Sequence, residues 1–328
     1  MDTTKRRRVT TVAALATALV CSTAGAQSFP TRAVRIVVAL APGGGTDIVA
    51  RAIAPKMSEI LGQSVIIENK SGAAGTIGAD LVAKSNPDGY TLLFHNMAQA
   101  SAPALYAKLP YDPATDFSPI GMVTDVPMVL VARKDFPAES LQGFIDYVKA
   151  NPDKVNFANA GVGATTNLCE VMMKSTLGAS WVSVSYKGTG PALNDLLAGQ
   201  VDVICDQPAS TLQHIRAGNI KALAVASKER ISSLPTTPTF SQSGMPGFQL
   251  SVWHALYAPK DTPKPVVDRI TKALNNALKD PGLIRRFGEM DASVATPAIA
   301  NPSYASKFLL TDIERWKVAM KNAGVKPQ

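Results

Sequence analysis

Short apolar runs alternate with amphipathic, helix-like segments along almost the whole chain of 328 residues. The first part holds three such pairs of a strand and a helix, at residues 34–40 with 47–61, 65–68 with 77–85, and 90–94 with 98–105. This alternation is typical of parallel sheets, because the connection between two parallel strands has to cross a face of the sheet. This part of the chain therefore predicts a βαβαβ unit.

The same alternation restarts in the middle of the chain. The predicted strands are 126–133, 155–158, 182–186, 201–205 and 220–226, and the predicted helices are 140–150, 168–177, 191–198 and 210–217. Residues 232–247 are rich in Pro, Ser, Thr and Gly, which predicts a long surface connection. The middle of the chain therefore predicts a second α/β unit with its own sheet.

After a strand at 250–258, the C-terminal part predicts only helices, at 263–278, 283–290 and 303–323. Because no further sheet begins there, we expect this tail to fold back on the first unit. The prediction is a discontinuous domain 1, residues 27–127 plus 254–328, with domain 2, residues 128–253, inserted into it. Two chain crossings between domains form a hinge, and ligands of such sheets bind in the crevice beyond the carboxyl ends of the strands.

Residues 1–26 have the pattern of a signal peptide. Lys5-Arg6-Arg7-Arg8 is a basic segment, residues 9–20 are apolar, and Ala24-Gly25-Ala26 has the small-x-small pattern of a cleavage site. The apolar stretch is too short to span a bilayer. We therefore expect export to the periplasm with cleavage near Ala26; the arginines leave open a twin-arginine route beside the general one.

Charge argues against nucleic acid as a partner. The formal net charge is +8, and removal of residues 1–26 lowers it to about +5. No run of Lys or Arg follows Arg8, and aromatic residues make up 6% of the chain. A mild positive excess suits the attraction of small anions instead.

Two cysteines, Cys169 and Cys205, remain after cleavage. An even number of cysteines in an exported protein suggests a disulfide, and two buried thiols are the alternative. Both fall in the predicted domain 2, near the ends of elements that could face one cleft.

Two glycine-rich loops stand at matching places, one in each predicted domain. Residues 41–47 (Ala-Pro-Gly-Gly-Gly-Thr-Asp) follow the first strand, and residues 161–167 (Gly-Val-Gly-Ala-Thr-Thr-Asn) follow the strand at 155–158. Each loop opens a helix, whose N-terminus carries partial positive charge and unpaired N–H groups. Either loop alone is more simply an ordinary turn in which Thr46 or Asp47 caps the helix. Their paired placement favours a clamp for a carboxylate.

The first glycine loop and the residues around it resemble a known family, the Bug-type periplasmic receptors of tripartite tricarboxylate transporters. The resemblance begins at Ala41–Arg51 (APGGGTDIVAR) and runs through nearly the whole mature chain. Its further motifs are Glu68-Asn69-Lys70, Pro87–Leu93, Tyr111-Asp112-Pro113, Tyr186-Lys187-Gly188, Gly199–Asp202, Leu234-Pro235 and Trp253 with Ala258-Pro259. Family members often have His where this chain has Asn167, and Asn cannot titrate.

The resemblance implies a fold and a set of partners. The fold would be a two-domain Venus flytrap of the type II-like periplasmic binding proteins. Each domain would be a mostly parallel sheet flanked by helices, and two crossover strands would join the domains. The partners would be a small organic acid or amino acid and a two-subunit inner-membrane permease, with the receptor acting as a monomer. Neither a cofactor nor a metal is implied.

The two loops and three strand ends supply the predicted ligand contacts. We expect these to be Pro42, Gly43, Gly44, Thr46, Asp47, Asn96, Gly161, Val162, Gly163, Thr165, Thr166, Asn167, Tyr186 and Asp206. At one strand end, either Asn96 or His95 would face the distal part of the ligand, and His95 is equally a satisfied strand-end histidine. Asp206 would accept a hydrogen bond from a ligand amine or hydroxyl, or cap the next helix.

Other functional classes fit less well. The chain lacks the G-x-S-x-G and H-E-x-x-H motifs, and residues 42–47 match neither a Walker loop nor G-x-G-x-x-G. The sequence therefore predicts a receptor and not an enzyme, against the alternative of a hydrolase or isomerase with Asp47 or Asp206 as base. A periplasmic carboxylate sensor that feeds a signalling partner would share the same fold and stays open.

Overall fold

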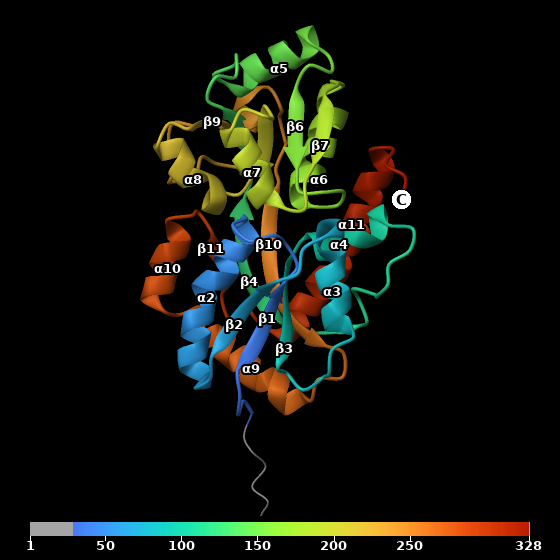
Figure 1. The fold of residues 1–328 in the computed structure, drawn as a ribbon, viewed down its shortest axis with the longest axis vertical. Helices are drawn as coiled ribbons and strands as arrows, with labels where there is room; N and C mark the ends of the chain where they lie inside the picture. Colours follow the sequence, from blue (N-terminus) through green and yellow to red (C-terminus); the bar gives the residue numbers. More distant parts are fainter. Residues whose placement is uncertain (1–28, 328) are drawn as a thin grey trace, which may run out of the picture.

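The structure is a computed structural model that describes residues 29–327. The predicted signal peptide and its cleavage site lie outside these residues. The described chain forms two lobes stacked along the long axis of the molecule, and each lobe is built around one sheet (Figure 1).

Lobe 1 contains a six-stranded sheet in the order β11-β4-β10-β3-β1-β2. Its strands are β1 (Val34–Val38), β2 (Val65–Asn69), β3 (Thr91–Asn96), β4 (Phe117–Pro127), β10 (Ser251–Pro259) and β11 (Ser293–Val294). Strand β1 pairs in parallel with β2 and β3. Strand β10 runs antiparallel to β3 and β4, and β11 runs antiparallel to β4.

Lobe 2 contains a five-stranded sheet in the order β7-β6-β8-β5-β9. Its strands are β5 (Val129–Arg133), β6 (Asn156–Asn159), β7 (Val182–Ser185), β8 (Val203–Asp206) and β9 (Ile220–Val225). Strand β6 is parallel to β7 and β8, whereas β5 is antiparallel to β8 and β9.

Helices flank both sheets. They are α2 (Gly45–Leu61), α3 (Thr76–Ala83), α4 (Ala98–Leu105), α5 (Leu141–Ala150), α6 (Thr165–Leu177), α7 (Thr189–Leu197), α8 (Pro208–Arg216), α9 (Lys264–Ala277), α10 (Pro281–Gly288) and α11 (Pro302–Asn322), with 3₁₀ turns at Ala73–Gly75 and Ser241–Ser243. The predicted α/β class and the two crossover strands are confirmed.

One detail of the predicted fold needs correction, because the sheets are mixed rather than mostly parallel. Strands β1 to β3 and β6 to β8 are the parallel parts, joined by helices as expected. Strands β4 and β10 carry the chain into lobe 2 and back, so they run in opposite directions side by side. The sequence analysis missed most of β4, where Pro119 and Gly121 disguise the strand pattern.

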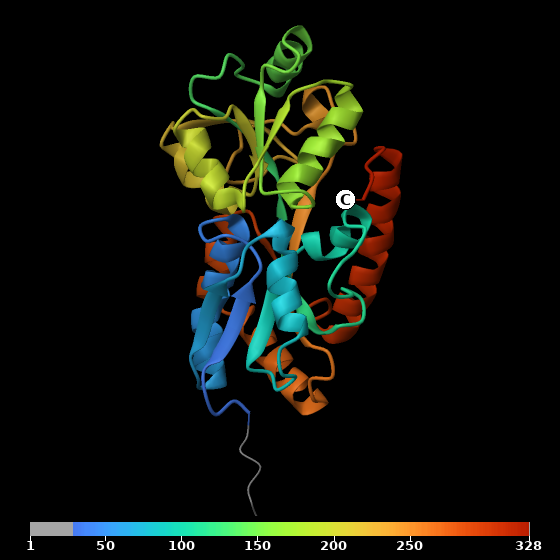
Figure 2. The same ribbon diagram turned by 45° about the vertical axis from the view of Figure 1, so that its right-hand side comes forward.

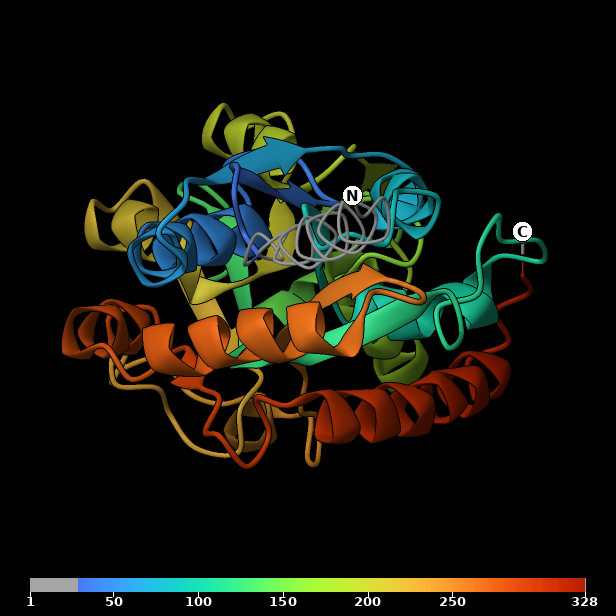
Figure 3. The same ribbon diagram turned by 90° about the horizontal axis from the view of Figure 1, so that it is seen from below.

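The C-terminal helices return to lobe 1. Helix α9 contacts α2 and β4, and α11 contacts α4 and β4. Figure 2 shows α11 running along the outside of lobe 1 beside α4, and Figure 3 shows α9 and α11 from below. Within residues 29–327, no helix has the length and apolar character needed to cross a membrane.

The chain leaves the lobe 1 sheet at Pro127 and enters the lobe 2 sheet at Val129. It leaves the lobe 2 sheet after β9 and returns to the lobe 1 sheet at Ser251. The backbone N–H of Met128 donates to the carbonyl of Leu250 over 3.1 Å, which ties the two connections together. The domain boundaries predicted at 127/128 and 253/254 remain our proposal for the hinge.

Candidate functional site

A small pocket lies between the lobes, where the carboxyl ends of the parallel strands face each other. Lobe 1 and lobe 2 both line it, through Leu40, Gly44, Thr46, Asn96, Met128, Ala160, Ala164, Thr165, Thr166, Thr189, Asp206 and Gln207. Its volume is about 20 Å³, roughly the space of one water molecule. A larger molecule can therefore enter only if the lobes move apart.

Four helices begin at this pocket. The lining residues include Gly44 and Thr46 at the start of α2, Thr165 at the start of α6, and Thr189 at the start of α7. Gln207 directly precedes α8. A helix N-terminus carries partial positive charge and N–H groups without intrahelical partners. These helix ends bring partial positive charge to a pocket whose lining, among residues 29–327, includes the acid Asp206 but no Lys or Arg.

The first-turn N–H groups of α2 and α6 are available to a ligand. The backbone N–H of Ile48 is the first in α2 to bond to a carbonyl four residues back, and Leu168 is the first in α6. Within residues 29–327, the N–H groups of Thr46 and Thr165 have no acceptor. Both residues are buried, and buried donors of this kind are normally satisfied by a partner.

The two glycine loops use the same device to hold their shape. The N–H of Gly43 donates to Asp47 Oδ2 over 3.0 Å, and the N–H of Gly163 donates to Asn167 Oδ1 over 3.1 Å. Gly43 and Gly163 have φ of 79° and 88°, in the region that favours glycine. The two loops therefore correspond atom by atom: the amide oxygen of Asn167 in lobe 2 takes the place of the carboxylate oxygen of Asp47 in lobe 1.

Asp47 has a full set of protein partners. Its carboxylate accepts from Arg51 Nε at 2.9 and 3.0 Å and from Asn69 Nδ2 at 2.9 Å, besides the N–H of Gly43. Asp47 is also absent from the residues that line the pocket. In this structure the Asp47 carboxylate therefore holds the loop in shape and does not border the pocket.

Thr46 lies at the centre of a buried polar network. Asn96 Nδ2 donates to Thr46 Oγ1 over 3.1 Å, and His254 Nε2 lies 3.2 Å from the same oxygen. Burial, and to a smaller degree nearby His95, lowers the pKa of His254 to about 3, so the ring is neutral. When Nε2 carries the proton, both lone pairs of Thr46 are occupied and its hydroxyl hydrogen is free to point into the pocket.

Replacing Thr46 with valine should cost about 1–3 kcal/mol of unfolding free energy, because it leaves Asn96 and His254 without their shared partner. Urea unfolding measures this loss. Thr311→Val is the matched control, since Thr311 is exposed on α11 and bonds only to its own helix. Equal stability of the two variants would contradict the role assigned to Thr46.

Three buried polar atoms around the pocket have no partner within residues 29–327. They are Thr165 Oγ1, Asp206 Oδ1 and Gln207 Oε1. Burial raises the pKa of Asp206 to about 6, although hydrogen bonds from Ser210 and the N–H of Gln207 oppose the shift. Groups of this kind need an explanation in a folded protein, and a ligand in the pocket provides one.

Several predicted contacts lie at the seam between the lobes instead of in the pocket. The carbonyl of Val162 accepts from Tyr106 Oη over 2.8 Å, and the carbonyl of Gly163 accepts from Ser101 Oγ over 3.1 Å. Pro42 and Gly43 are exposed. Gly161 stands close to Ala74 of lobe 1. Val162, Gly163 and Gly161 thus contribute to the contact between the lobes.

Tyr186 and Thr166 make internal contacts in lobe 2. Tyr186 Oη donates to Asp195 Oδ2 over 2.7 Å, and Tyr186 does not line the pocket. Burial and Asp195 raise the pKa of Tyr186 to about 12. Thr166 lines the pocket while its Oγ1 accepts from the N–H of Ala160 over 2.7 Å.

Of the two candidates at the end of β3, Asn96 lines the pocket and His95 does not. His95 is buried, and its Nδ1 has no partner within the described residues. Burial lowers the pKa of His95 to about 3, so it is neutral. Among residues 29–327, no group of His, Cys, Asp or Glu is arranged to hold a metal ion.

Cys169 in α6 and Cys205 in β8 are placed as a disulfide, with Sγ atoms 2.05 Å and Cα atoms 6.3 Å apart. Cys205 directly precedes Asp206, and Cys169 follows Asn167 by two residues. The bridge therefore joins two of the elements that carry the pocket.

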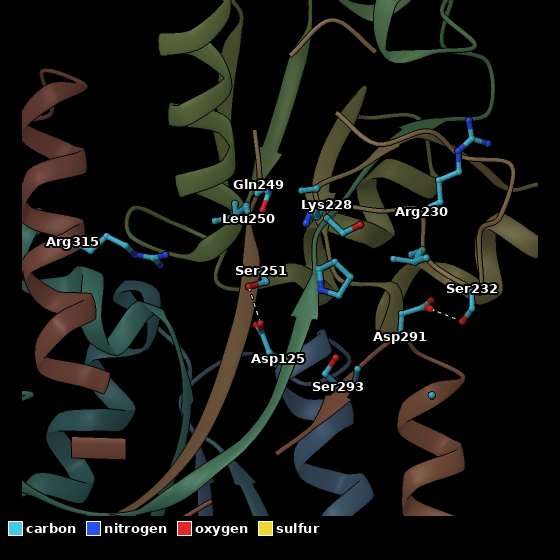
Figure 4. Close-up of a pocket in the computed structure, with 16 residues that line it drawn as sticks. Asp125, Lys228, Arg230, Ser232, Gln249, Leu250, Ser251, Asp291, Ser293 and Arg315 are labelled. Atoms are coloured by element: carbon cyan, nitrogen blue, oxygen red, sulfur yellow. Dashed lines mark hydrogen bonds between the residues drawn. The ribbon is translucent and has the colours of Figure 1, made fainter. Parts of the chain in front are cut away.

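A second, larger pocket of about 690 Å³ lies beside the crossover strands (Figure 4). It is bordered by Asp125 and Ser251 of the crossovers, Ser232 of lobe 2 and Asp291 of lobe 1. Ser251 Oγ donates to Asp125 Oδ2 over 3.0 Å, and Ser232 Oγ donates to Asp291 Oδ1 over 2.8 Å across the lobes. None of the predicted ligand contacts lines it, so we assign it to the hinge.

Besides the apolar lining residues, three polar residues in and around the pocket were not predicted from the sequence. Thr189 is the first residue of α7, which follows β7. The strand, glycine and helix pattern that identified the two glycine loops also occurs here and would have indicated Thr189. Gln207 adjoins the predicted Asp206. His254 lies on β10 opposite Asn96, and nothing in the sequence connects it with Thr46.

Two lobes joined by two crossover strands, with a pocket between them at helix N-termini, are the architecture of a periplasmic binding protein. Residues 49–325 match the model of the tripartite tricarboxylate transporter family receptors. The chain therefore belongs to this receptor family.

Known proteins resemble it over most of their length. The UPF0065 protein of the TAR-I ttuE-ttuC' intergenic region of Agrobacterium vitis is 42% identical, covering 90% of this chain and 86% of that protein. The periplasmic binding protein BugD has a structure with 45% identity and a TM-score of 0.89, covering 92% of this chain and all of that one. MatC from Rhodopseudomonas palustris, solved with bound malate, has 38% identity and a TM-score of 0.85, covering 88% and 99%.

Proposed function

We propose that this protein is an exported receptor that captures a small carboxylate between its lobes and delivers it to a two-subunit membrane permease. It would act in the periplasm as a monomer, after removal of a signal peptide near Ala26. The observation that carries the proposal is the pair of helix N-termini, α2 and α6: Thr46 and Thr165 line the pocket, and their backbone N–H groups have no backbone acceptor within residues 29–327.

Helix N-termini bind carboxylates with backbone N–H groups and partial positive charge, and they need no Arg or Lys. The free donors of Thr46 and Thr165 come from opposite lobes, so one carboxylate between them would hold the lobes closed. Malate bound to the related MatC supports a carboxylate as the ligand here. Export argues against nucleotides, which are the other common anions at such loops.

The proposal assigns distinct roles to the predicted residues. Gly44, Thr46, Thr165 and Thr166 would surround the ligand carboxylate, because they line the pocket at the two helix ends. Asp47 and Asn167 would keep the loops in shape through the N–H groups of Gly43 and Gly163.

A thermal-shift screen of short mono-, di-, hydroxy- and amino acids tests the proposal. At about 10 mM, an acid that binds with a Kd near 100 μM would add about 2.7 kcal/mol of stability and raise the Tm by several degrees. Calorimetry should then give one site per chain, and the acid should be recovered unchanged. A screen in which no carboxylate stabilises the protein, or in which the acid is turned over, would overturn the proposal.

A further inference from the structure

Asp206 offers an unused acceptor to the pocket. It ends β8, and its side chain is 1% exposed. Its Oδ2 accepts from Ser210 Oγ over 2.6 Å, whereas its Oδ1 has no partner within residues 29–327. The neighbouring Gln207, which is 4% exposed, likewise has an unpartnered Oε1. Two adjacent acceptors therefore line the pocket on the side of lobe 2.

No side chain that lines the pocket carries a positive charge to balance that of Asp206, and the helix N-termini supply only partial charges. Asp206 is the one ionisable side chain in that set. A buried carboxylate without a cation or a further donor is costly, because its lost hydration is not replaced. A ligand that brings a hydrogen-bond donor to Oδ1 would repay this cost, whereas a ligand carboxylate at the same place would meet a like charge.

The acceptors come close to the carboxylate loops when the lobes are together. A Cβ atom built on Gly45, the first residue of α2, would lie 2.6 Å from Cδ of Gln207. The side chain of Gln207 thus packs directly on the helix end of the opposite lobe. Donor and carboxylate on the ligand must therefore be only a few bonds apart.

We infer that Asp206, assisted by Gln207, is a specificity residue that requires a hydroxyl or ammonium group near the ligand carboxylate and disfavours a second carboxylate. This inference rests on the proposed function, since it presumes that one carboxylate is held at α2 and α6. It narrows the ligand class to short hydroxy or amino acids.

Two matched series of acids test the inference by calorimetry. One consists of propanoate, lactate, alanine and malonate, and the other of butanoate, 3-hydroxybutanoate, 3-aminobutanoate and succinate. Within each series the number of carbon atoms is constant; the second group is absent, a hydroxyl, an ammonium, or a carboxylate in place of the terminal methyl group. We expect a hydroxyl or ammonium member of at least one series to bind about tenfold or more tightly than its unsubstituted and dicarboxylate counterparts, a difference of about 1.4 kcal/mol.

Asp206→Asn is the decisive variant, since it keeps the shape and removes the charge. It should lower the affinity for the preferred acid about tenfold or more and reduce discrimination against the dicarboxylate of the series. Asp135→Asn, at an exposed position of lobe 2, removes the same charge without touching the pocket. Circular dichroism checks the fold, and Gln207→Leu, expected to shift preference in the same direction, serves if Asp206→Asn does not fold.

The pH dependence of binding is a separate test if the preferred ligand is an acid with an ammonium group. Because the pKa of Asp206 is raised to about 6, its charge is present at pH 8 and largely lost at pH 5. The two histidines on the lobe 1 side, His254 and His95, have pKa values of about 3 and stay neutral over this range. Binding of the ammonium acid should therefore weaken from pH 8 to pH 5, and it should not do so in Asp206→Asn.

The outcomes separate the inference from the proposed function. If acids bind but a dicarboxylate or an unsubstituted acid binds as tightly as its donor-bearing counterparts in both series, the inference fails and the receptor remains. If Asp206→Asn has the same selectivity as the wild type, the inference likewise fails while the proposed receptor function remains. If no acid of the screen or of either series binds, the proposed function fails and the inference fails with it.

Discussion

Replacing Gly190 with alanine is expected to weaken ligand binding about tenfold or more, at least about 1.4 kcal/mol, without destabilising either lobe. Gly190 is the second residue of α7, where alanine is a better helix former than glycine. A Cβ atom at this position would lie 2.4 Å from the carbonyl oxygen of Pro42 in the opposite lobe. Because this neighbour is backbone, the lobes themselves must separate.

The measurement is calorimetry with the tightest acid from the screen, together with small-angle scattering of the liganded protein. Gly288→Ala is the control, since Gly288 ends a helix of lobe 1 and a Cβ there would meet nothing within 4 Å. Gly190→Leu should have a larger effect. Wild-type affinity in both Gly190 variants would show that the closed contact at Pro42 is not needed for binding.

Removing the bridge between Cys169 and Cys205 is expected to lower the unfolding free energy of lobe 2 by about 4 kcal/mol. This is the loop-closure value for the 36 residues that separate the cysteines. Both cysteines are buried, so the Cys169→Ala/Cys205→Ala variant avoids placing hydroxyls in the core. Urea unfolding, with and without reductant, measures the change.

The double variant has no disulfide to reduce, so it serves as the control for other effects of the reductant. Reducing agent should destabilise the wild type toward the value of the double variant and leave the variant unchanged. The mass after alkylation should rise by two adducts only when reductant is present. Alkylation of both thiols in untreated, unfolded protein would show that the bridge is not formed.

Many of the helices and strands could be predicted because each is encoded by the pattern of its own short segment of sequence. Residues 98–105 form the expected helix, and the strands and helices of lobe 2 agree within a few residues. Strand β4 was hidden because Pro119 and Gly121 are poor strand residues; they are tolerated here because β11 pairs with β4 only at Thr124 and Asp125. The mixed sheets could not be seen either, since strand direction depends on where β4 and β10 cross between the lobes.

The candidate site was predictable where a strand, a glycine turn and a helix follow each other in sequence. That rule placed Gly44, Thr46, Thr165 and Thr166 beside the pocket. It could not say which side chains of the loops would be occupied by other contacts. Asp47 bonds to Arg51 and Asn69, and Tyr186 bonds to Asp195, through contacts that only the folded chain reveals.

The first-turn N–H groups of Thr46 and Thr165, which have no backbone acceptor within residues 29–327, belong to the main chain, and so among single substitutions only proline deletes one of them. An ancestral receptor of this shape could exchange the few side chains around them without losing its hold on a carboxylate. At Thr189, Asp206 and Gln207, which line the pocket, we expect such exchanges to change which acid binds. Laboratory libraries limited to these codons should yield receptors with altered preferences while the scaffold stays intact.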